Sequence, residues 1–230
     1  MSGKAKTKSV GIDRDVLARG DVMSLARERD GNSSAVLSDE ALLASRRAMV
    51  PDDYAEDLWV FGYGSLIWNP VVSFNHQIMA TIYGYHRRFC MWTTIGRGSP
   101  DCPGLVLGLD KGGSTKGMVF RIDKEIAVRE LDILWRREMM ADSYKPVWVT
   151  AQTDEGPLRA LTFAMRRDRP IFAPPMPLDK TARIIHDAVG FVGPCKEYLL
   201  NTQEALASVG IYDKQMAQLS KLVGQLSKTR

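Results

Sequence analysis

The chain has 230 residues, of which 45% are hydrophobic and 25% charged, a composition that suits a soluble globular protein with a sizeable core. Its 31 basic and 27 acidic residues leave a formal net charge of +4, an excess too small to indicate a nucleic-acid partner. The three cysteines, Cys90, Cys102 and Cys195, form neither a disulfide framework nor a zinc pattern, which favours a reducing compartment such as the cytoplasm.

The N-terminal segment differs in character from the rest of the chain. Residues 1–35 are polar and interrupted by glycine and serine, so we expect a disordered extension there, followed by one domain over residues 36–230. Acidic residues alternate with the arginines of the segment, which argues against a targeting peptide. No stretch approaches the roughly 20 consecutive apolar residues of a membrane span, and we therefore expect no membrane partner.

The predicted elements begin with a short helix over residues 41–49, with Ser38 as its cap and Pro51 after its end. A buried strand over residues 58–61 follows and stops at a glycine loop. Further strand-like runs lie at residues 78–83, 88–92, 105–109, 116–122, 147–152 and 159–165. Short strands at this spacing predict a small, closed or strongly bent β-barrel.

Helices dominate the remaining sequence. One helical pattern, residues 124–141, interrupts the strands, and we expect Asp123 to cap it. After a proline-rich stretch, three more helices are predicted at residues 179–191, 194–209 and 212–226, with Asp213 as the cap of the last. Because strands come first and helices last, the fold class is expected to be α+β.

A glycine loop directly follows the first buried strand. Glycine permits close backbone approach, and successive N–H groups in such a turn can bind a carboxylate or a phosphate. The alternative is a tight turn that only reverses the chain. The loop lacks the lysine of a P-loop, and Pro70 breaks the helix that should follow, so a nucleotide site is disfavoured. The residues that would bind the anion are Tyr63, Gly64, Ser65 and Leu66.

Glu138 lies on the hydrophobic face of the predicted helix 124–141. At about 100° per residue it falls in the middle of an arc of apolar residues. The arc consists of Ala127, Val128, Leu131, Leu134 and Trp135. A carboxylate on this face must be paired with another group, have a raised pKa, or lie at the mouth of a pocket. Each of these arrangements is found at general acid–base residues. The alternatives are a salt bridge to Arg88 or Arg97, or a frayed last turn that lets the carboxylate reach water. The histidines have no metal spacing, and no catalytic triad is apparent.

Several separated motifs resemble those of the ChaC-like γ-glutamylcyclotransferases. They are residues 60–70 (Val-Phe-Gly-Tyr-Gly-Ser-Leu-Ile-Trp-Asn-Pro), 84–89, 96–99 with 103–104, 134–139 with Tyr144 and Pro146, and the closing segments 193–194, 198–202 and 206–210. The resemblance covers about residues 36–226. Two positions depart from the family pattern: Leu105 stands where arginine is expected, and Phe120 where tyrosine is common.

The resemblance implies a small β-barrel with flanking helices that releases 5-oxoproline and cysteinylglycine from reduced glutathione, without metal or cofactor. It makes Glu138 the residue that moves the protons and the loop 63–66 the site of the substrate's α-carboxylate. Tyr144 is the candidate donor to the developing oxyanion, with a core tyrosine bonded to the backbone as the alternative. Arg97 is the candidate contact for the glycine carboxylate, with a structural arginine as an equal alternative.

Three other functions compete with this interpretation. The first is cyclisation of other γ-glutamyl amino acids or amines, and the second is a non-catalytic γ-glutamyl-binding module. The third is an RNA- or phosphate-binding protein. The presence of both Glu138 and the glycine loop argues against the second, and the small net charge argues against the third. The sequence leaves the oligomeric state open.

Overall fold

The structure is a computed structural model that describes residues 14–19, 36–94 and 96–228. Its described helices are α1 (Arg14–Arg19), α3 (Asp39–Met49), the 3₁₀ turn η1 (Ser65–Ile67), α4 (Ala127–Glu138), α5 (Leu178–Asp187), α6 (Cys195–Ser208) and α7 (Lys214–Leu226). Its strands are β1 (Leu58–Gly62), β2 (His76–Thr93), β3 (Gly104–Ile122), β4 (Tyr144–Thr153), β5 (Gly156–Met165), β6 (Val189–Gly190) and β7 (Gly193–Pro194).

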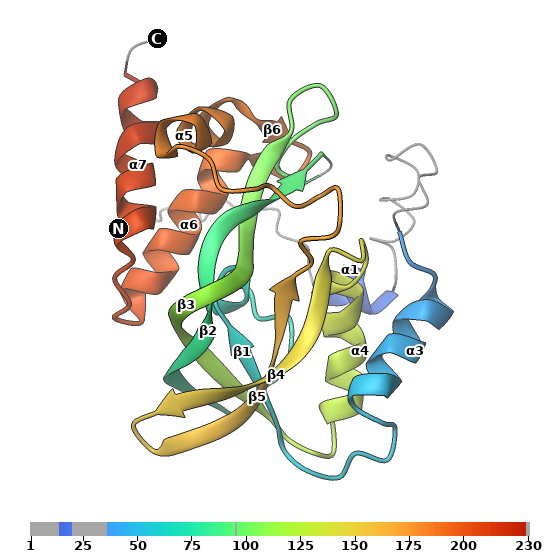
Figure 1. The fold of residues 1–230 in the computed structure, drawn as a ribbon. Coiled ribbons are helices and arrows are strands. Elements are labelled where there is room, and N and C mark those ends of the chain that lie inside the picture. The colour runs from blue at the N-terminus through green and yellow to red at the C-terminus, as the bar shows by residue number, and fades with distance from the viewer. Residues whose placement is uncertain (1–13, 20–35, 95, 229–230) are drawn as a thin grey trace, which may run out of the picture.

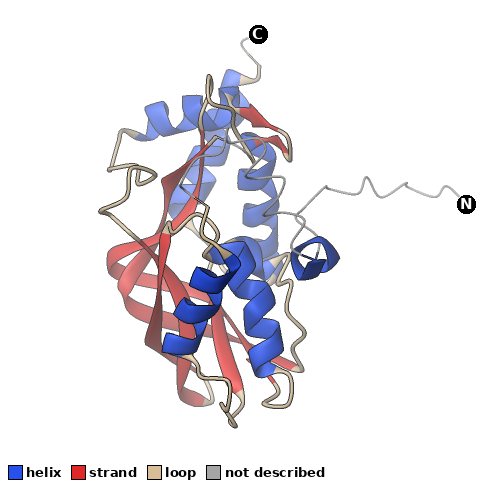
Figure 2. Cartoon of the chain, turned by 90° about the vertical axis from the view of Figure 1, so that its right-hand side faces the viewer, coloured by secondary structure: helices blue, strands red, loops and turns tan. Residues whose placement is uncertain are grey.

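Five strands close into a barrel in the order β1-β3-β2-β4-β5, which the pairing of β5 with β1 completes, and β3 also pairs with β5. Helices flank the barrel, and the expected α+β barrel is confirmed (Figure 1). In Figure 1, α1, α3 and α4 lie on one side and α5, α6 and α7 on the other. Figure 2 looks onto the first group and shows α3 and α4 in front of the strands. The pocket described below lies where elements of both groups meet the barrel.

The long strands β2 and β3 correct the sequence prediction, which divided each of them into two short strands. They pair antiparallel along nearly their whole length, with register shifts between Tyr83 and Tyr85 and between Phe89 and Met91. Gly84 adopts a φ of 83°, a conformation that glycine reaches without steric cost. Such bulges bend and twist a strand without ending it. Gly84 therefore lies in a bulge that bends one continuous strand around the barrel.

Helix starts were predicted correctly where the capping contact is local. The Ser38 hydroxyl accepts from the Ala41 amide at 3.2 Å, and Asp213 accepts from the Met216 amide at 3.0 Å. The expected cap Asp123 was wrong, because α4 begins only at Ala127. The Asp123 carboxylate instead accepts a hydrogen bond from the side chain of Asn75, which lies far away in sequence.

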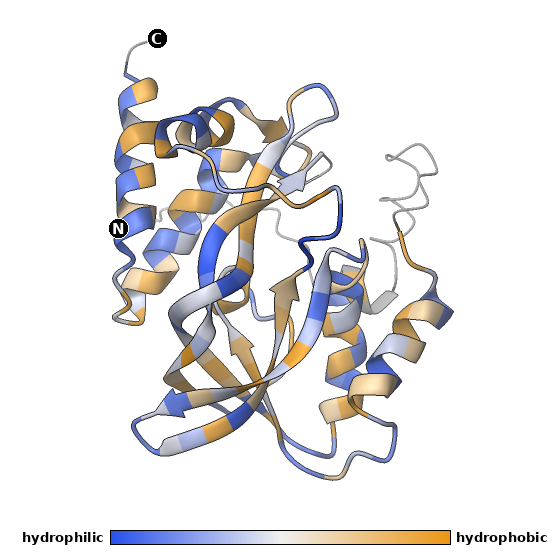
Figure 3. Cartoon of the chain, viewed as in Figure 1, coloured by the Kyte–Doolittle hydropathy of each residue, from blue (hydrophilic) through white to orange (hydrophobic). Residues whose placement is uncertain are grey.

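The C-terminal helices each bury one apolar face: α5 and α6 pack on β3, and α7 packs on α5 and α6. Along α7, Met216, Leu219 and Val223 are buried, and Figure 3 shows hydrophobic and hydrophilic residues alternating along this helix. This spacing of three and four residues is typical of an amphipathic surface helix. None of the helices described is long and apolar enough to cross a membrane.

Helices α1 and α3 brace the back of α4. Arg14 donates to the fully buried Glu130 at 2.6 Å, and Arg46 donates to Asp132 at 2.9 Å. The Trp135 indole donates to the Ser45 hydroxyl at 2.8 Å. Part of the expected disordered extension is thus a helix, because residues 14–19 pack on α4 with Leu17 buried. The remainder of that extension, residues 1–13 and 20–35, lies outside the described residues.

The Arg14→Met substitution is expected to lower the free energy of unfolding by about 2 kcal/mol, because it leaves the Glu130 carboxylate buried without its cation. The value lies below that of a fully buried pair because Arg14 is one-third exposed. Urea unfolding at pH 7 measures it. Arg129→Met is the matched control: Arg129 lies 3.6 Å from the same carboxylate but is 71% exposed, so little change is expected. Equal losses of stability in the two variants would contradict this role of the Arg14–Glu130 ion pair.

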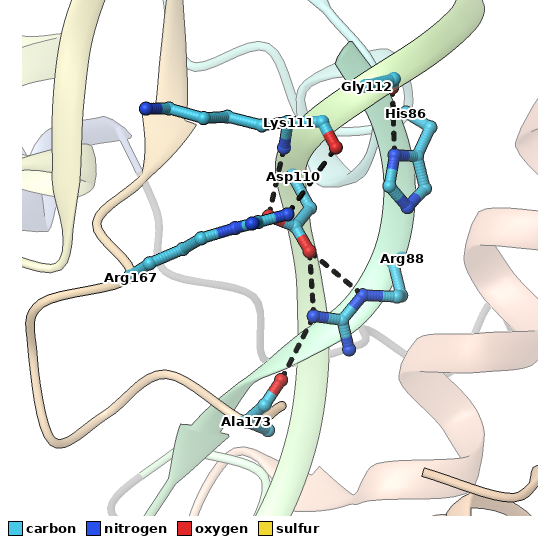
Figure 4. Close-up of polar contacts among 7 residues, drawn as sticks. All are labelled: His86, Arg88, Asp110, Lys111, Gly112, Arg167 and Ala173. Atoms are coloured by element: carbon cyan, nitrogen blue, oxygen red, sulfur yellow. Dashed lines mark hydrogen bonds and ion pairs between the residues drawn. The ribbon is translucent and has the colours of Figure 1, made fainter. Parts of the chain in front are cut away.

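Asp110 ties the segment after β5 to the barrel wall (Figure 4). This carboxylate is 1% exposed and accepts from Arg88 Nη2 at 2.8 Å, from Arg167 Nε at 2.6 Å and from the Lys111 amide at 2.9 Å. Arg88 also donates to the Ala173 carbonyl at 3.0 Å. The network holds residues 171–173 beside β2, where the Ala173 amide donates to the Cys90 carbonyl at 2.8 Å.

Candidate active site

One pocket, with a cavity volume of about 200 Å³, brings together every residue that the sequence analysis assigned to a site. It is built from the β1–η1 turn, β2, residues 96–97, β3, the end of α4, β4, β5, residue 192 and α6. The predicted site residues that line it are Tyr63, Gly64, Ser65, Leu66, Arg97, Glu138 and Tyr144. Residues far apart in the sequence therefore share one cavity large enough for part of a small peptide.

Glu138 is the last residue of α4, and its side chain is 13% exposed. Burial raises the pKa of this carboxyl above its ordinary value of 4.5, while the neighbouring Arg137, at 3.2 Å, opposes the rise. The last turn is closed, because the Met139 amide donates to the Trp135 carbonyl at 2.8 Å. The frayed-turn alternative is therefore wrong.

The expected alternative of a salt bridge from Glu138 to Arg88 or Arg97 is also wrong, because both arginines pair with other carboxylates. Arg88 pairs with Asp110 at 2.8 Å, and Arg97 pairs with Glu197 at 3.3 Å. The carboxylate of Glu138 is thus left with one cation neighbour, Arg137, among the ion pairs of the described residues. A carboxyl group with a raised pKa and access to a pocket is suited to accepting and returning a proton.

The glycine loop forms a tight 3₁₀ turn at the end of β1. The Ile67 amide donates to the Gly64 carbonyl at 2.9 Å, and the Trp68 amide donates to the Ser65 carbonyl at 3.2 Å. The first amides of such a turn have no partner within the turn itself. Because Gly64, Ser65 and Leu66 line the pocket, the turn presents its amino end to the same cavity as Glu138.

Arg137 connects the turn with Glu138, and sequence reasoning missed it. Its guanidinium donates to the Ser65 hydroxyl at 2.7 Å, to the Asn69 carbonyl, and lies 3.2 Å from the Glu138 carboxylate. The side chain is 9% exposed and lines the pocket. The available signal was its position three residues after Leu134, at the edge of the apolar face of the helix.

Three buried tyrosines surround the cavity. Tyr63 donates to the Phe163 carbonyl at 3.1 Å, and Tyr144 donates to the Leu107 carbonyl at 3.2 Å. Burial raises the pKa of Tyr63, Tyr144 and Tyr198, and the nearby Glu138 carboxylate adds to each rise. The hydroxyls are therefore neutral donors at physiological pH. The bond from Tyr144 to the backbone is the arrangement expected of a core tyrosine, although the residue also lines the pocket.

Tyr198, from α6, is a second pocket residue that the sequence analysis did not assign to the site. It belongs to the closing segment 198–202, whose likeness to the family was noted only as a helix motif. Its hydroxyl lies 3.5 Å from the position that a side chain on Gly64 would occupy. The C-terminal helices thus supply part of the cavity wall beside the turn.

Arg97 lines the pocket and is 6% exposed. It donates to the Pro194 carbonyl at 3.2 Å and pairs with Glu197 at 3.3 Å. The next residue, Gly98, packs against backbone: a Cβ there would lie 2.2 Å from the Gly104 amide nitrogen. This close approach fixes the loop that carries Arg97. Arg97 is therefore both a structural arginine and a residue of the cavity wall.

The fold and the pocket define a class of protein: an α+β barrel whose cavity carries a buried carboxyl group suited to acid–base chemistry. The sequence model of the family described as ChaC-like protein matches residues 58–226. The chain belongs to the ChaC-like family.

Curated relatives and solved structures agree with this assignment. The glutathione-specific gamma-glutamylcyclotransferase of Escherichia coli (strain K12) is 35% identical over 187 residues, which cover 81% of this chain and 80% of that protein. The glutathione-specific gamma-glutamylcyclotransferase 1 of Homo sapiens is 31% identical, with 76% and 82% covered. The crystal structure of a yeast gamma-glutamyl cyclotransferase specific to glutathione matches with a TM-score of 0.66 at 26% identity, covering 74% of this chain and 96% of that one.

Proposed function

We propose that this protein is a glutathione-specific γ-glutamylcyclotransferase of the cytoplasm, which converts reduced glutathione to 5-oxoproline and cysteinylglycine. The observation that carries the proposal is the buried Glu138 carboxyl, with its raised pKa, in one pocket with the turn at residues 63–66. The names of the bacterial and human relatives support glutathione as the substrate. The free thiols of Cys90, Cys102 and Cys195 support a reducing compartment.

The substrate would bind with its γ-glutamyl end beside the turn. The amides of Gly64, Ser65 and Leu66 suit the α-carboxylate, because successive N–H groups in a turn form an anion site. The guanidinium of Arg137, held against Ser65, adds positive charge behind this end. Arg97 lines the same pocket, where it would meet the glycine carboxylate at the other end of glutathione.

The reaction would use Glu138 twice. The α-amino group of glutathione is protonated near neutral pH, so Glu138 first removes a proton from it. The amine nitrogen then forms a bond to the γ-carbonyl carbon and closes the five-membered ring. When the bond from that carbon to the cysteine nitrogen breaks, Glu138 returns the proton to the leaving nitrogen. The ring nitrogen loses its extra proton, which the departing amine takes up through solvent, so that a neutral lactam and a protonated amine result. Because the attack is intramolecular, holding the chain folded back can contribute about 7–11 kcal/mol.

Negative charge develops on the γ-carbonyl oxygen during the attack and needs a hydrogen-bond donor. Tyr144 is our candidate for this donor. In this role its hydroxyl would exchange the bond with the Leu107 carbonyl for a bond with the substrate. The raised pKa of Tyr144 supports the neutral, proton-bearing form that such a donor requires.

N-acetylated glutathione is expected to release no 5-oxoproline, because its nitrogen cannot attack as a free amine. Glutathione should be turned over with a higher kcat/KM than γ-glutamyl amino acids such as γ-glutamylalanine, because only glutathione offers a glycine carboxylate to Arg97. Measuring 5-oxoproline release from the three compounds side by side tests both statements. Cyclisation of the acetylated compound would overturn the amine attack. An equal or higher kcat/KM for γ-glutamylalanine would favour the broader cyclotransferase.

A further inference from the structure

Arg87 is a buried arginine that the mechanism above does not use. It lies on β2, its side chain is 5% exposed, and its three donor groups reach three different parts of the molecule. Nη1 donates to the Tyr63 carbonyl at 2.6 Å, and Nη2 donates to the Lys116 carbonyl at 2.9 Å. Nε donates to the Asp213 carboxylate at 2.9 Å. Arg87 therefore joins the turn of the pocket to β3 and to the start of α7.

The contact with Tyr63 fixes the orientation of a peptide group in the site. The residues described contain no cis peptide bond, and in a trans peptide the N–H points away from the C=O. With its oxygen held by Arg87, the Tyr63–Gly64 peptide must direct the Gly64 N–H to the opposite side. Tyr63 and Gly64 line the pocket and Arg87 does not, so the guanidinium holds this peptide from behind.

We propose that Arg87 is a positioning residue, which orients the Gly64 N–H toward the α-carboxylate of the substrate. The identity of that carboxylate rests on the proposed function. A cation on the carbonyl side also polarises the peptide, which makes its N–H a stronger donor. Arg87 thus acts on the substrate through the Tyr63–Gly64 peptide and does not contact the substrate itself.

Asp213 fixes the orientation of the Arg87 guanidinium. One of its carboxylate oxygens caps α7 by accepting from the Met216 amide at 3.0 Å, and the other accepts from Arg87. Asp213→Asn keeps an equally good helix cap but removes the charge. This variant should therefore weaken the positioning of Arg87 while α7 stays in place. It is a second, milder perturbation of the contact between Arg87 and the Tyr63–Gly64 peptide.

The neighbouring Arg88 offers a matched control. It is also buried, and it also joins a carboxylate, Asp110, with a backbone carbonyl, that of Ala173 (Figure 4). Successive side chains of a strand point to opposite faces, and the hydrogen bonds of Arg88 within the described part of the chain go to Asp110 and Ala173 and not to the turn at residues 63–66. Arg88→Met therefore removes a comparable buried arginine on the same strand without changing the Tyr63–Gly64 peptide.

Two substrates separate positioning from stability. Glutathione carries the α-carboxylate, and 4-aminobutyryl-cysteinylglycine has the same amine and carbonyl but lacks the carboxylate. Arg87→Met should lower kcat/KM for glutathione about 100-fold, the size that misplacing a substrate group by about 1 Å can cost. It should lower kcat/KM for the analogue by a much smaller factor. Arg87→Lys should fall between, because a lysine can reach fewer of the acceptors. Equal losses for both substrates, or the same discrimination in Arg88→Met, would overturn the proposal.

A binding measurement decides the question without turnover. In the full-length protein labelled with ¹⁵N-glycine, 5-oxoproline serves as the probe because it carries the same carboxylate. The Gly64 amide resonance should shift in the wild type and in Arg88→Met, shift less in Asp213→Asn, and stay in place in Arg87→Met. A full shift in Arg87→Met, or none in the wild type, would overturn the role of Arg87. A wild-type shift without cleavage of glutathione would instead refute the proposed function alone.

Discussion

The substitution Glu138→Gln is expected to lower the rate of 5-oxoproline release by about 10²–10⁴-fold, the range that a positioned acid–base group contributes. Glutamine keeps the size of the side chain but can neither take the proton from the α-amino group nor return it. Steady-state kinetics with glutathione measure the loss, and calorimetric titration checks that binding persists. Glu125→Gln, an exposed acid just before α4, is the control and should retain wild-type turnover. Near-normal turnover of Glu138→Gln would end the proposed mechanism.

The raised pKa of Glu138 gives the same variant a second, opposite effect. Turnover needs the ionised carboxylate, so wild-type kcat should fall as the pH drops through the raised pKa. For stability the sign reverses. Because the folded state binds the proton more tightly than the unfolded state, this group favours folding at acid pH, and that contribution is lost as the pH rises through the folded pKa. Glu138→Gln should therefore be more stable than the wild type at pH 8, and this difference in stability should be smaller at pH 5. A difference in melting temperature that does not grow with pH would contradict the burial of this carboxylate.

The largest loss of stability is expected for Asp110→Ala, about 3–5 kcal/mol in the free energy of unfolding. The substitution leaves Arg88 buried without its carboxylate and releases Arg167 from the barrel wall. Burial raises the pKa of Asp110, but hydrogen bonds from Arg167 and Arg88 outweigh it, so the pKa lies below 3.8. The stabilisation is therefore present above that value and is lost as the pH falls through the folded pKa.

Urea unfolding at pH 7 and at pH 3 measures this effect. The difference between wild type and Asp110→Ala should be smaller at pH 3, because this pH lies below the ordinary pKa of 3.8 and the unfolded chain then takes up the proton. Asp168→Ala provides the control, because this carboxylate is 64% exposed and pairs with Arg166 at the surface. It should change stability little. A comparable loss in Asp168→Ala would contradict the role assigned to the buried network.

Local patterns predicted the parts of the site that depend on local structure. The apolar arc of α4 indicated a buried carboxyl at Glu138, and the glycines after β1 indicated a turn that lines a pocket. Caps such as Ser38 were predictable because the capping bond spans three residues. The spacing of the strands left open whether the β-barrel is closed or only strongly bent. The family resemblance implied a small β-barrel with flanking helices.

Contacts between distant segments could not be predicted in this way. Arg137 bonds Ser65, 72 residues away, and Arg87 bonds Asp213, 126 residues away. A helix projection or a strand alternation gives the face of such a residue but not its partner. The same limit explains Asp123, whose carboxylate is taken by Asn75 across the structure instead of by its own helix. The division of β2 into two short strands was wrong for another reason, because the bulge at Gly84 bends the strand without ending it.

The account is tested most directly by incubating the purified protein with reduced glutathione at neutral pH and measuring both products over time. We expect 5-oxoproline and cysteinylglycine to appear in equal amounts, at a rate that depends on the carboxyl group of residue 138. If glutathione stays intact, or if the products form equally fast once that carboxyl is an amide, the cavity around Glu138 is not the active site described above.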